Sequence, residues 1–218
     1  MEIVHEQINR YVEQLLDNQE MWDRSTTLLR LEQEGRAEGI PNIQRSGIAL
    51  IRMLLQLTSP RRILEIGTAI GYSSIHMALA VPDAEIITLE LDAERAERAS
   101  RNFAEAGVNE RVRCIHGDAL HTIGEVAGPF DVLFIDAAKG KYKEFMQLAL
   151  PKLRSGGWMA SDNVLFQGLV TMPVEELPAN KRSMIRKLQS YNDMLSTHPE
   201  LETLIIPTGD GVAISRKR

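Results

Sequence analysis

A chain of 218 residues with 44% hydrophobic residues is long enough to bury the core of one large domain. No apolar run reaches the roughly eighteen residues of a membrane span, so we expect no membrane segment, and the first residues lack the pattern of a signal peptide. The only cysteine, Cys114, excludes an intrachain disulfide and suits the cytoplasm, where we expect the protein to work. The net charge of −5 is unevenly distributed: residues 1–138 carry 13 basic and 22 acidic side chains, and residues 139–218 carry 12 and 8. The overall charge therefore does not exclude an RNA partner.

Helical periodicity dominates residues 1–60, which we predict to form a helical N-terminal extension. Apolar residues recur there at intervals of three or four positions, which predicts helices at 3–16, about 19–37 and about 44–57. A Gly-Ile-Pro sequence at 39–41 is expected to end the second helix.

From residue 61 to residue 218, short apolar runs alternate with helical segments, as in βαβ units. The sequence predicts strands at 61–67, 84–91, 111–117, 130–136 and 156–163, and helices at 71–81, 92–107, 119–127, 141–153 and 180–197. Asp92 is the expected N-cap of the second of these helices, and Gly107 is expected to follow its end. Because several strands are nearly all apolar, they belong in a parallel sheet covered on both faces. Two final strands, 201–207 and 211–218, flank a tight turn and predict an antiparallel hairpin at one edge.

Gly and acidic residues follow three successive strands. Gly67 and Gly71 have the spacing G-x-x-x-G, so the G-x-G-x-x-G fingerprint of dinucleotide-binding proteins is absent. Glu90 ends the second strand, where a carboxylate can accept hydrogen bonds from both hydroxyls of a ribose. Asp118 follows the third strand and suits an adenine edge, and we expect Ser73 to point outward from the glycine turn. Each residue alone fits ordinary turn chemistry, but together they favour a nucleoside with an amino-acid-like tail, as in S-adenosylmethionine.

Oxygen-bearing side chains follow the next two strands. The apolar run 132–135 ends at Asp136, and Asp162 and Asn163 follow a neighbouring strand. Two carboxylates and one amide oxygen form a ligand set for a hard divalent cation such as Mg²⁺. The alternative for Asp162 and Asn163 is turn formation, which both residue types favour.

The combination of motifs resembles one enzyme family. ExGxxxGYS at 65–73, Glu90, DAAK at 136–139, SDNVL at 161–165 and the C-terminal GDGVAIS are similar to the metal-dependent catechol/caffeoyl-CoA-type O-methyltransferases. IDAAKGKY, DNVLFQGLV and GDGVAISRK look most like the bacterial tRNA 5-hydroxyuridine methyltransferases of this family, which make 5-methoxyuridine at the wobble position. The resemblance implies a single domain, 1–218, with an α/β Rossmann-like class I methyltransferase fold, a seven-stranded mostly parallel sheet, and usually a homodimer.

The resemblance also implies roles for individual residues. The metal ligands would be Asp136, Asp162 and Asn163. S-adenosylmethionine would contact Ile43, Glu65, Gly67, Ser73, Glu90, Asp118, Ala119 and Asp136. Lys139 matches the catalytic base of catechol-type members, with Asp136 beside it, although a lysine that starts a helix can also be merely solvated. The catechol enzyme's additional substrate-binding glutamate and the plant enzymes' CoA-contacting segment have no clear counterpart, which weakens a catechol or acyl-CoA assignment.

The expected partner is therefore a tRNA anticodon loop, with no DNA. A 5-hydroxyuridine offers two vicinal oxygens, as a catechol does, and its base is accessible only in a single-stranded loop. The alternatives are an O-methyltransferase of small catechol-like or caffeoyl-CoA-like acceptors and a non-catalytic RNA-binding module, against which the intact ligand set argues. Three basic clusters would form an RNA-binding surface only if they converge in space: 139–143, 181–187 and 216–218.

Overall fold

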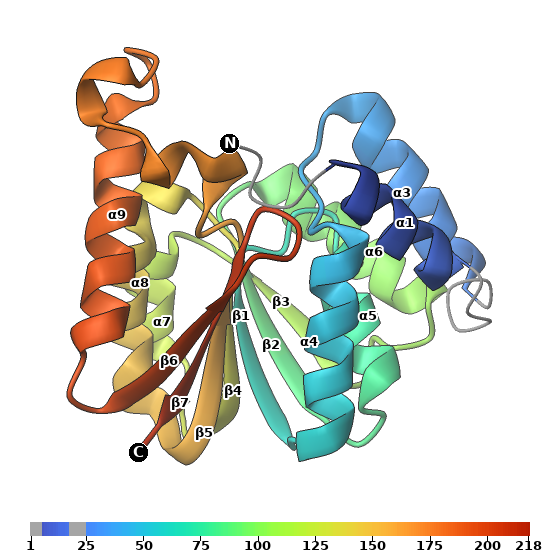
Figure 1. The fold of residues 1–218 in the computed structure, drawn as a ribbon. Coiled ribbons are helices and arrows are strands. Elements are labelled where there is room, and N and C mark those ends of the chain that lie inside the picture. Colours follow the sequence, from blue (N-terminus) through green and yellow to red (C-terminus); the bar gives the residue numbers. More distant parts are fainter. Residues whose placement is uncertain (1–5, 18–24) are drawn as a thin grey trace.

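The computed structural model describes residues 6–17 and 25–218, and its centre is a seven-stranded sheet with helices on both faces (Figure 1). The strand order is β3-β2-β1-β4-β5-β7-β6. The first five strands in this order, from β3 through β2, β1 and β4 to β5, are parallel to one another. Strand β7 is antiparallel to β5, and β6 is antiparallel to β7. The predicted mostly parallel sheet and its C-terminal antiparallel hairpin are confirmed.

The central strands are the most deeply buried. Ile63, Leu64, Val132 and Leu133 of β1 and β4 are fully buried, as their apolar character on both faces requires. The strand order reverses between β1 and β4, and ligands of open α/β sheets bind at the carboxyl side of such a switch point. The strands are β1 (Arg62–Ile66), β2 (Glu85–Glu90), β3 (Val112–His116), β4 (Phe130–Ile135), β5 (Leu153–Ser161), β6 (Leu201–Ile206) and β7 (Val212–Lys217).

Helices cover the two faces in separate layers. One face packs against α4 (Arg45–Thr58), α5 (Tyr72–Ala80) and α6 (Ala93–Glu105), and the other against α7 (Ala119–Glu125), α8 (Tyr142–Ala149) and α9 (Arg182–Thr197) (Figure 1). The predicted helix 141–153 is wrong in its extent. Only α8 is α-helical, because Pro151 cannot continue an α-helix. The short turn η1 (Lys139–Lys141) precedes α8, and the short turn η2 (Leu150–Lys152) follows it. The segment before α9 holds two further short turns, η3 (Phe166–Thr171) and η4 (Val174–Glu176).

Local capping residues set several helix boundaries. The Asp92 side chain accepts a hydrogen bond from the Arg95 N–H, so it is the N-cap of α6 as predicted. Gly107 follows that helix with a φ of 69°, the left-handed conformation that glycine adopts without strain. Ser25 caps α3 (Thr26–Glu38) through the Leu28 N–H. The helix predicted from 19 therefore begins at Thr26, and positions 19–24 lie outside the described residues.

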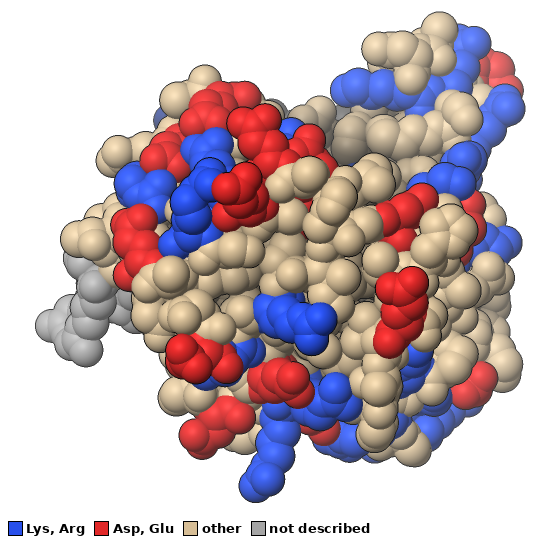
Figure 2. Space-filling model, turned by 180° about the vertical axis from the view of Figure 1, so that it is seen from behind, with Lys and Arg blue, Asp and Glu red and all other residues tan. Residues whose placement is uncertain are grey.

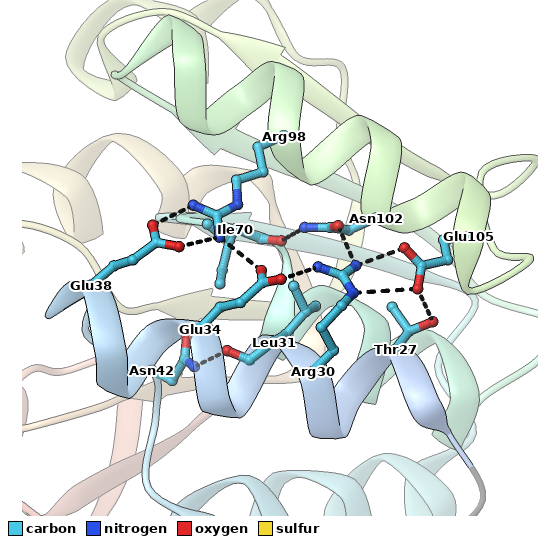
Figure 3. Close-up of polar contacts among 10 residues, drawn as sticks. All are labelled: Thr27, Arg30, Leu31, Glu34, Glu38, Asn42, Ile70, Arg98, Asn102 and Glu105. Carbon is cyan, nitrogen blue, oxygen red and sulfur yellow. Dashed lines mark hydrogen bonds and ion pairs between the residues drawn. The ribbon is translucent and has the colours of Figure 1, made fainter.

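The N-terminal extension consists of α1 (Glu6–Asp17), α3 and α4, and positions 3–5 of the first predicted helix lie outside the described residues. Charged side chains join α3 to α6 (Figure 3). Arg30 lies 2.7 Å from both Glu34 and Glu105, and Arg98 lies 2.7 Å from Glu34 and 2.6 Å from Glu38. Because these charges form a connected network rather than isolated pairs, they hold the extension on the core more firmly than single surface ion pairs would.

Cys114 lies in β3, one of the strands predicted from the sequence. The side chain is half-buried because β3 is an edge strand of the sheet. Burial still raises the pKa of the Cys114 thiol to about 11, so it is not a nucleophile at neutral pH. None of the helices in the described part of the chain is long and apolar enough to cross a membrane.

Candidate active site at the carboxyl edge of the sheet

A cavity of about 400 Å³ opens at the carboxyl ends of β1 to β4, within the size range of small-ligand sites. Residues that follow four strands converge on it, including most of the site predicted from the sequence. The predicted lining residues are Gly67, Glu90, Asp118, Ala119, Asp136 and Lys139. Sequence reasoning missed the apolar wall, since Pro41, Leu91 and Phe145 have no signal that separates them from ordinary core or surface positions.

Gly67 makes the turn from β1 possible. Its φ is 100°, and a Cβ at this position would collide with the backbone carbonyl of Asp136. The Asp136 N–H donates to the Ile66 carbonyl at 2.9 Å, so the two loops after β1 and β4 lie against each other. Only glycine permits this close approach, which brings Asp136 to the cavity wall.

Glu90 is fixed in place by backbone donors. Its carboxylate accepts hydrogen bonds from the N–H groups of Ala69 at 2.7 Å, Thr68 at 3.2 Å and Asp92 at 3.0 Å. A carboxylate has about four acceptor sites, and the three backbone donors leave one of them, on Oε1, for a ribose hydroxyl. The loop after β1 is thereby fastened to the end of β2 around the cavity.

Asp118 lies at the start of α7 and serves as its N-cap. One carboxylate oxygen accepts the Leu120 N–H at 2.9 Å, and the neighbouring Ala119 is buried against the cavity. The other carboxylate oxygen can accept from an exocyclic amine, the donor group of an adenine edge. Phe145 supplies an apolar surface from α8 in the same cavity.

Three of the predicted cofactor residues lie outside the cavity lining. Glu65 is fully buried and accepts hydrogen bonds from the hydroxyls of Ser73 and Ser74. The expectation that Ser73 points outward is therefore wrong: its hydroxyl is turned inward because the buried Glu65 carboxylate needs donors. Burial raises the pKa of Glu65 to about 7. Ile43 is buried against Gly47 of α4 and lines a separate pocket, so cofactor contacts of these residues stay predictions.

Asp162 and Asn163 leave the end of β5 beside Asp136, as the adjacent strands β4 and β5 require. Asp162 is 2% exposed, and its Oδ2 atom has no hydrogen-bond partner in the described chain. Burial and the nearby Asp136 carboxylate hold the pKa of Asp162 well above its usual range. Asn163 has a φ of 57°, a conformation that asparagine tolerates better than most residues.

This donor set fits a hard divalent cation. In the described ranges, no three or more His, Cys, Asp or Glu side chains form a metal-binding group. The candidate ligands are instead two carboxylates, Asp136 and Asp162, and the amide oxygen of Asn163. A buried carboxylate oxygen without a donor, beside a second carboxylate, is destabilising unless a cation compensates it. Oxygen ligands of this kind suit Mg²⁺ or Ca²⁺.

Lys139 is held at the site rather than extended into solvent. Its Nζ donates to Asp136 Oδ1 at 2.9 Å, and the side chain is only 16% exposed. The same Nζ lies 5.9 Å from the centre of the Tyr142 ring, whose hydroxyl donates to the Asp162 carbonyl at 3.0 Å. A lysine with these contacts can take a proton from an acceptor hydroxyl after it has released one of its own.

A further acid, Asp210, faces the same edge from the turn between β6 and β7. Burial raises the pKa of Asp210, and Lys139 opposes that effect. The side chain of Gln44, the residue before α4, lies against Gly209 of the same turn and so joins the turn to the N-terminal extension. The GDG sequence indicated only a turn here, because nothing local to it shows that the turn folds over the site.

Comparisons with known proteins agree with this geometry. The family model for O-methyltransferases matches residues 26–218. A catechol O-methyltransferase of Niastella koreensis is 32% identical over 210 residues, which cover 93% of this chain and 90% of the relative. A Staphylococcus aureus structure described as a caffeoyl-CoA O-methyltransferase has a TM-score of 0.89 at 32% identity and covers 98% of this chain and 100% of its own.

A third similar structure was solved with the methyl donor. The O-methyltransferase TomG of Streptomyces achromogenes, in complex with S-adenosylmethionine, has a TM-score of 0.81 at 30% identity, and the match covers 97% of this chain and 96% of TomG. The cavity described above has the glycine turn, acidic strand ends and volume that such a donor needs. The chain therefore belongs to the O-methyltransferase family, in its class I caffeoyl-CoA and catechol-type group, and is an S-adenosylmethionine-dependent O-methyltransferase.

Proposed function

We propose that this enzyme methylates the 5-hydroxyl of 5-hydroxyuridine at the tRNA wobble position, giving 5-methoxyuridine. A hard divalent cation such as Mg²⁺ would be held by Asp136, Asp162 and Asn163. The observation that carries the choice of tRNA is a basic surface beside the cavity. The proposed substrate also places the reaction in the cytoplasm.

Basic side chains from two elements gather on this surface. Lys141 and Lys143 at the start of α8 are exposed, as are Arg186 and Lys187 on α9, and η1 packs directly against α9. Figure 2 shows blue side chains along the right-hand side, where α9 lies, with some red side chains among them, and a dense mixture of red and blue over α3 and α6 at the upper left. Lys141 is paired with Glu144 at 3.6 Å, whereas Lys143, Arg186 and Lys187 have no ion pair with the described residues. Such cations beside a cavity are suited to the phosphates of an RNA backbone.

The three basic clusters expected from the sequence do not all join this surface. Arg182 donates to the carbonyls of Glu175 and Leu177, so it fastens the segment before α9. The third cluster, 216–218, runs toward the opposite edge of the sheet: the Arg218 carbonyl accepts from Ser155 near the start of β5, at 2.7 Å. Convergence is therefore limited to the clusters on η1, α8 and α9.

Each residue of the site has its own role in the proposed methyl transfer. S-adenosylmethionine, when bound, supplies a methyl group on a sulfonium, and Glu90, Asp118 and Gly67 hold its nucleoside and position it. Transfer of this methyl is an in-line displacement, for which positioning supplies most of the catalysis. The cation, when bound, lowers the pKa of the acceptor hydroxyl and orients two vicinal oxygens. Lys139 receives the hydroxyl proton, and Asp136 keeps Lys139 at the reacting oxygen.

A second candidate is methylation of small catechol-like or caffeoyl-CoA-like acceptors. It is favoured by the similar proteins, which include a catechol O-methyltransferase and a caffeoyl-CoA O-methyltransferase of Populus kitakamiensis, 32% identical over 174 residues. Both candidates use the same vicinal-oxygen chemistry, so the acceptor has to be decided by experiment.

The test is an acceptor comparison with S-adenosylmethionine and Mg²⁺ supplied. Transfer RNA that contains 5-hydroxyuridine, the same tRNA with unmodified uridine, catechol and caffeoyl-CoA are compared by kcat/KM. We expect product only from the hydroxyuridine tRNA at micromolar concentration, and loss of product when EDTA removes the cation. Efficient methylation of catechol or caffeoyl-CoA, with none of the tRNA, would overturn the proposal in favour of the second candidate.

We also propose that two copies of the chain pair through α1. The side chains of Ile8, Tyr11 and Leu15 are 55%, 61% and 47% exposed, although α1 already packs Leu16 against the core. An exposed apolar helix face of this kind usually marks an interface, and a second copy of the same face is its simplest complement.

A further inference from the structure

A second, smaller pocket of about 140 Å³ lies beside the cofactor cavity, between η1, α8 and α9. Lys139 lines both cavities, so the two lie next to each other. The other lining residues used here are Tyr142, Lys143, Glu144, Lys187 and Ser190. We refer to it as the lysine pocket. Apart from Lys139, its lining has no part in the methyl transfer described above.

The charge of the lysine pocket is positive and largely uncompensated. Lys143 and Lys187 are exposed, and neither has an ion pair with the described residues of the chain. Glu144, the one acid of the lining, is 3.6 Å from Lys141, and Lys139 is paired with Asp136. Two ammonium groups and the Ser190 hydroxyl therefore remain to meet an anion.

The Lys187 side chain is directed toward η1 and not away from the protein. Its Cδ and Nζ atoms lie 3.7 and 4.0 Å from the position that a Cβ on Gly140 would take. Lys187 thus approaches from α9 while Lys143 approaches from α8, and the two cations face one pocket from separate elements. Lysine is a common phosphate ligand because its ammonium is a compact charge with three donors.

The floor of the pocket connects it to the reaction site. Tyr142 lines the pocket, and its hydroxyl is bonded to the backbone carbonyl of Asp162 at 3.0 Å. Lys139, the shared wall, lies 2.9 Å from Asp136. A group bound in the lysine pocket therefore meets two side chains, Lys139 and Tyr142, that also contact Asp136 and Asp162.

We propose that the lysine pocket binds a phosphate of the acceptor, the one adjacent to the nucleoside that is methylated. This inference rests on the proposed function in one respect: the acceptor must be a nucleotide. The pocket would then select nucleotides over free nucleosides and catechols, and it would fix the direction in which the RNA strand crosses the site.

The first experiment measures transfer to three small acceptors: 5-hydroxyuridine, its 5′-monophosphate and its 3′-monophosphate. The variant is the double substitution Lys143→Ala/Lys187→Ala, and the matched control is Arg113→Ala, an exposed cation on the far edge strand β3. We expect one monophosphate to have a KM at least tenfold below that of the nucleoside in the wild type. The double variant should lose this advantage and keep the kcat and KM of the nucleoside, and the control should change neither.

The second experiment needs no methyl transfer. Calorimetric titration of uridine 5′- and 3′-monophosphates against uridine measures the phosphate contribution directly, with inorganic phosphate as competitor. Binding of a monophosphate at least tenfold tighter than uridine, lost in the double variant, supports the pocket even if no hydroxyuridine acceptor is methylated. In that case the proposed function would be wrong, and the phosphate site in the lysine pocket would still be supported. Equal binding of nucleoside and monophosphates, or an undiminished advantage in the double variant, overturns the lysine pocket whatever the acceptor is.

Discussion

Glu65 is a buried carboxylate whose ionisation we expect to destabilise the folded protein. It lies in the central strand β1, is fully buried, and is surrounded by the hydroxyls of Ser73, Ser74 and Thr88. Hydroxyl donors stabilise the ionised form less than burial destabilises it, so the pKa of Glu65 rises from 4.5 to about 7. We predict that Glu65→Gln, which keeps the shape but cannot ionise, removes a pH-dependent loss of stability.

The sign and size of the effect follow from that shift. Between pH 4.5 and 7 the folded state holds a proton on Glu65 that the unfolded chain has released. The stability linked to this proton is fully present below pH 4.5 and is lost as pH rises through 7. Each pKa unit corresponds to about 1.4 kcal/mol, so the free energy of unfolding should fall by about 3 kcal/mol through this residue. That is a large part of the roughly 5–15 kcal/mol typical of a whole domain.

The assay is urea denaturation of the wild type and Glu65→Gln at pH 4.5 and pH 8. Asp162 and Asp210 also have pKa values raised by burial, but they titrate in both proteins, so the difference between the two proteins isolates Glu65. Relative to the wild type, Glu65→Gln should gain about 3 kcal/mol on going from pH 4.5 to 8. Glu110→Gln, at an exposed position, is the control and should show no such gain. The same difference in stability at both pH values would refute the reasoning.

Three further predictions concern the site and the assembly. Asp162→Ala should reduce methyl transfer by at least about a hundredfold, because it removes a cation ligand. Calorimetry should show little change in cofactor affinity, and a complete loss of cofactor binding would contradict the assignment of Asp162 to the cation alone. Glu90→Ala should weaken cofactor binding by about 1–3 kcal/mol, because it removes charge-assisted hydrogen bonds, and an unchanged dissociation constant would exclude Glu90 from the ribose contact. Tyr11→Glu should convert a dimer to a monomer in sedimentation velocity, since it places a charge in an apolar contact; a wild type that sediments as a monomer refutes pairing through α1.

The order of helices and strands could be predicted because its signals are local. Apolar alternation, the cap at Asp92 and the glycine at 107 each act within a few residues, and the structure bears them out. The errors fall where a single residue overrides a longer pattern. Pro151 divides a segment with helical periodicity, and Ser25 sets the start of α3 within a run that reads as continuous helix.

The approach of strand ends to one another was also predictable, but the directions of side chains were not. Parallel strands bring Glu90, Asp118, Asp136 and Asp162 to one edge of the sheet whatever else the fold contains. The inward turn of Ser73 depends on a buried partner that the motif does not reveal. Contacts between residues far apart in the chain, such as those joining α3 to α6, depend on packing that no local signal describes.

The same edge of the sheet gathers charges that act against folding. The carboxyls of Asp162 and Asp210 have raised pKa values because they are buried, and Lys139 is the cation that faces both. A protein selected for stability alone would have no reason to place these acids together, since apolar residues of similar volume would stabilise it more. The acids are useful only if something positive binds them, either a cation or a substrate that brings one. The buried acids at this edge are thus an argument for the cation site that does not depend on the resemblance to any family. The ion pairs between α3 and α6 lie in a different part of the fold, where each acid is paired with an arginine.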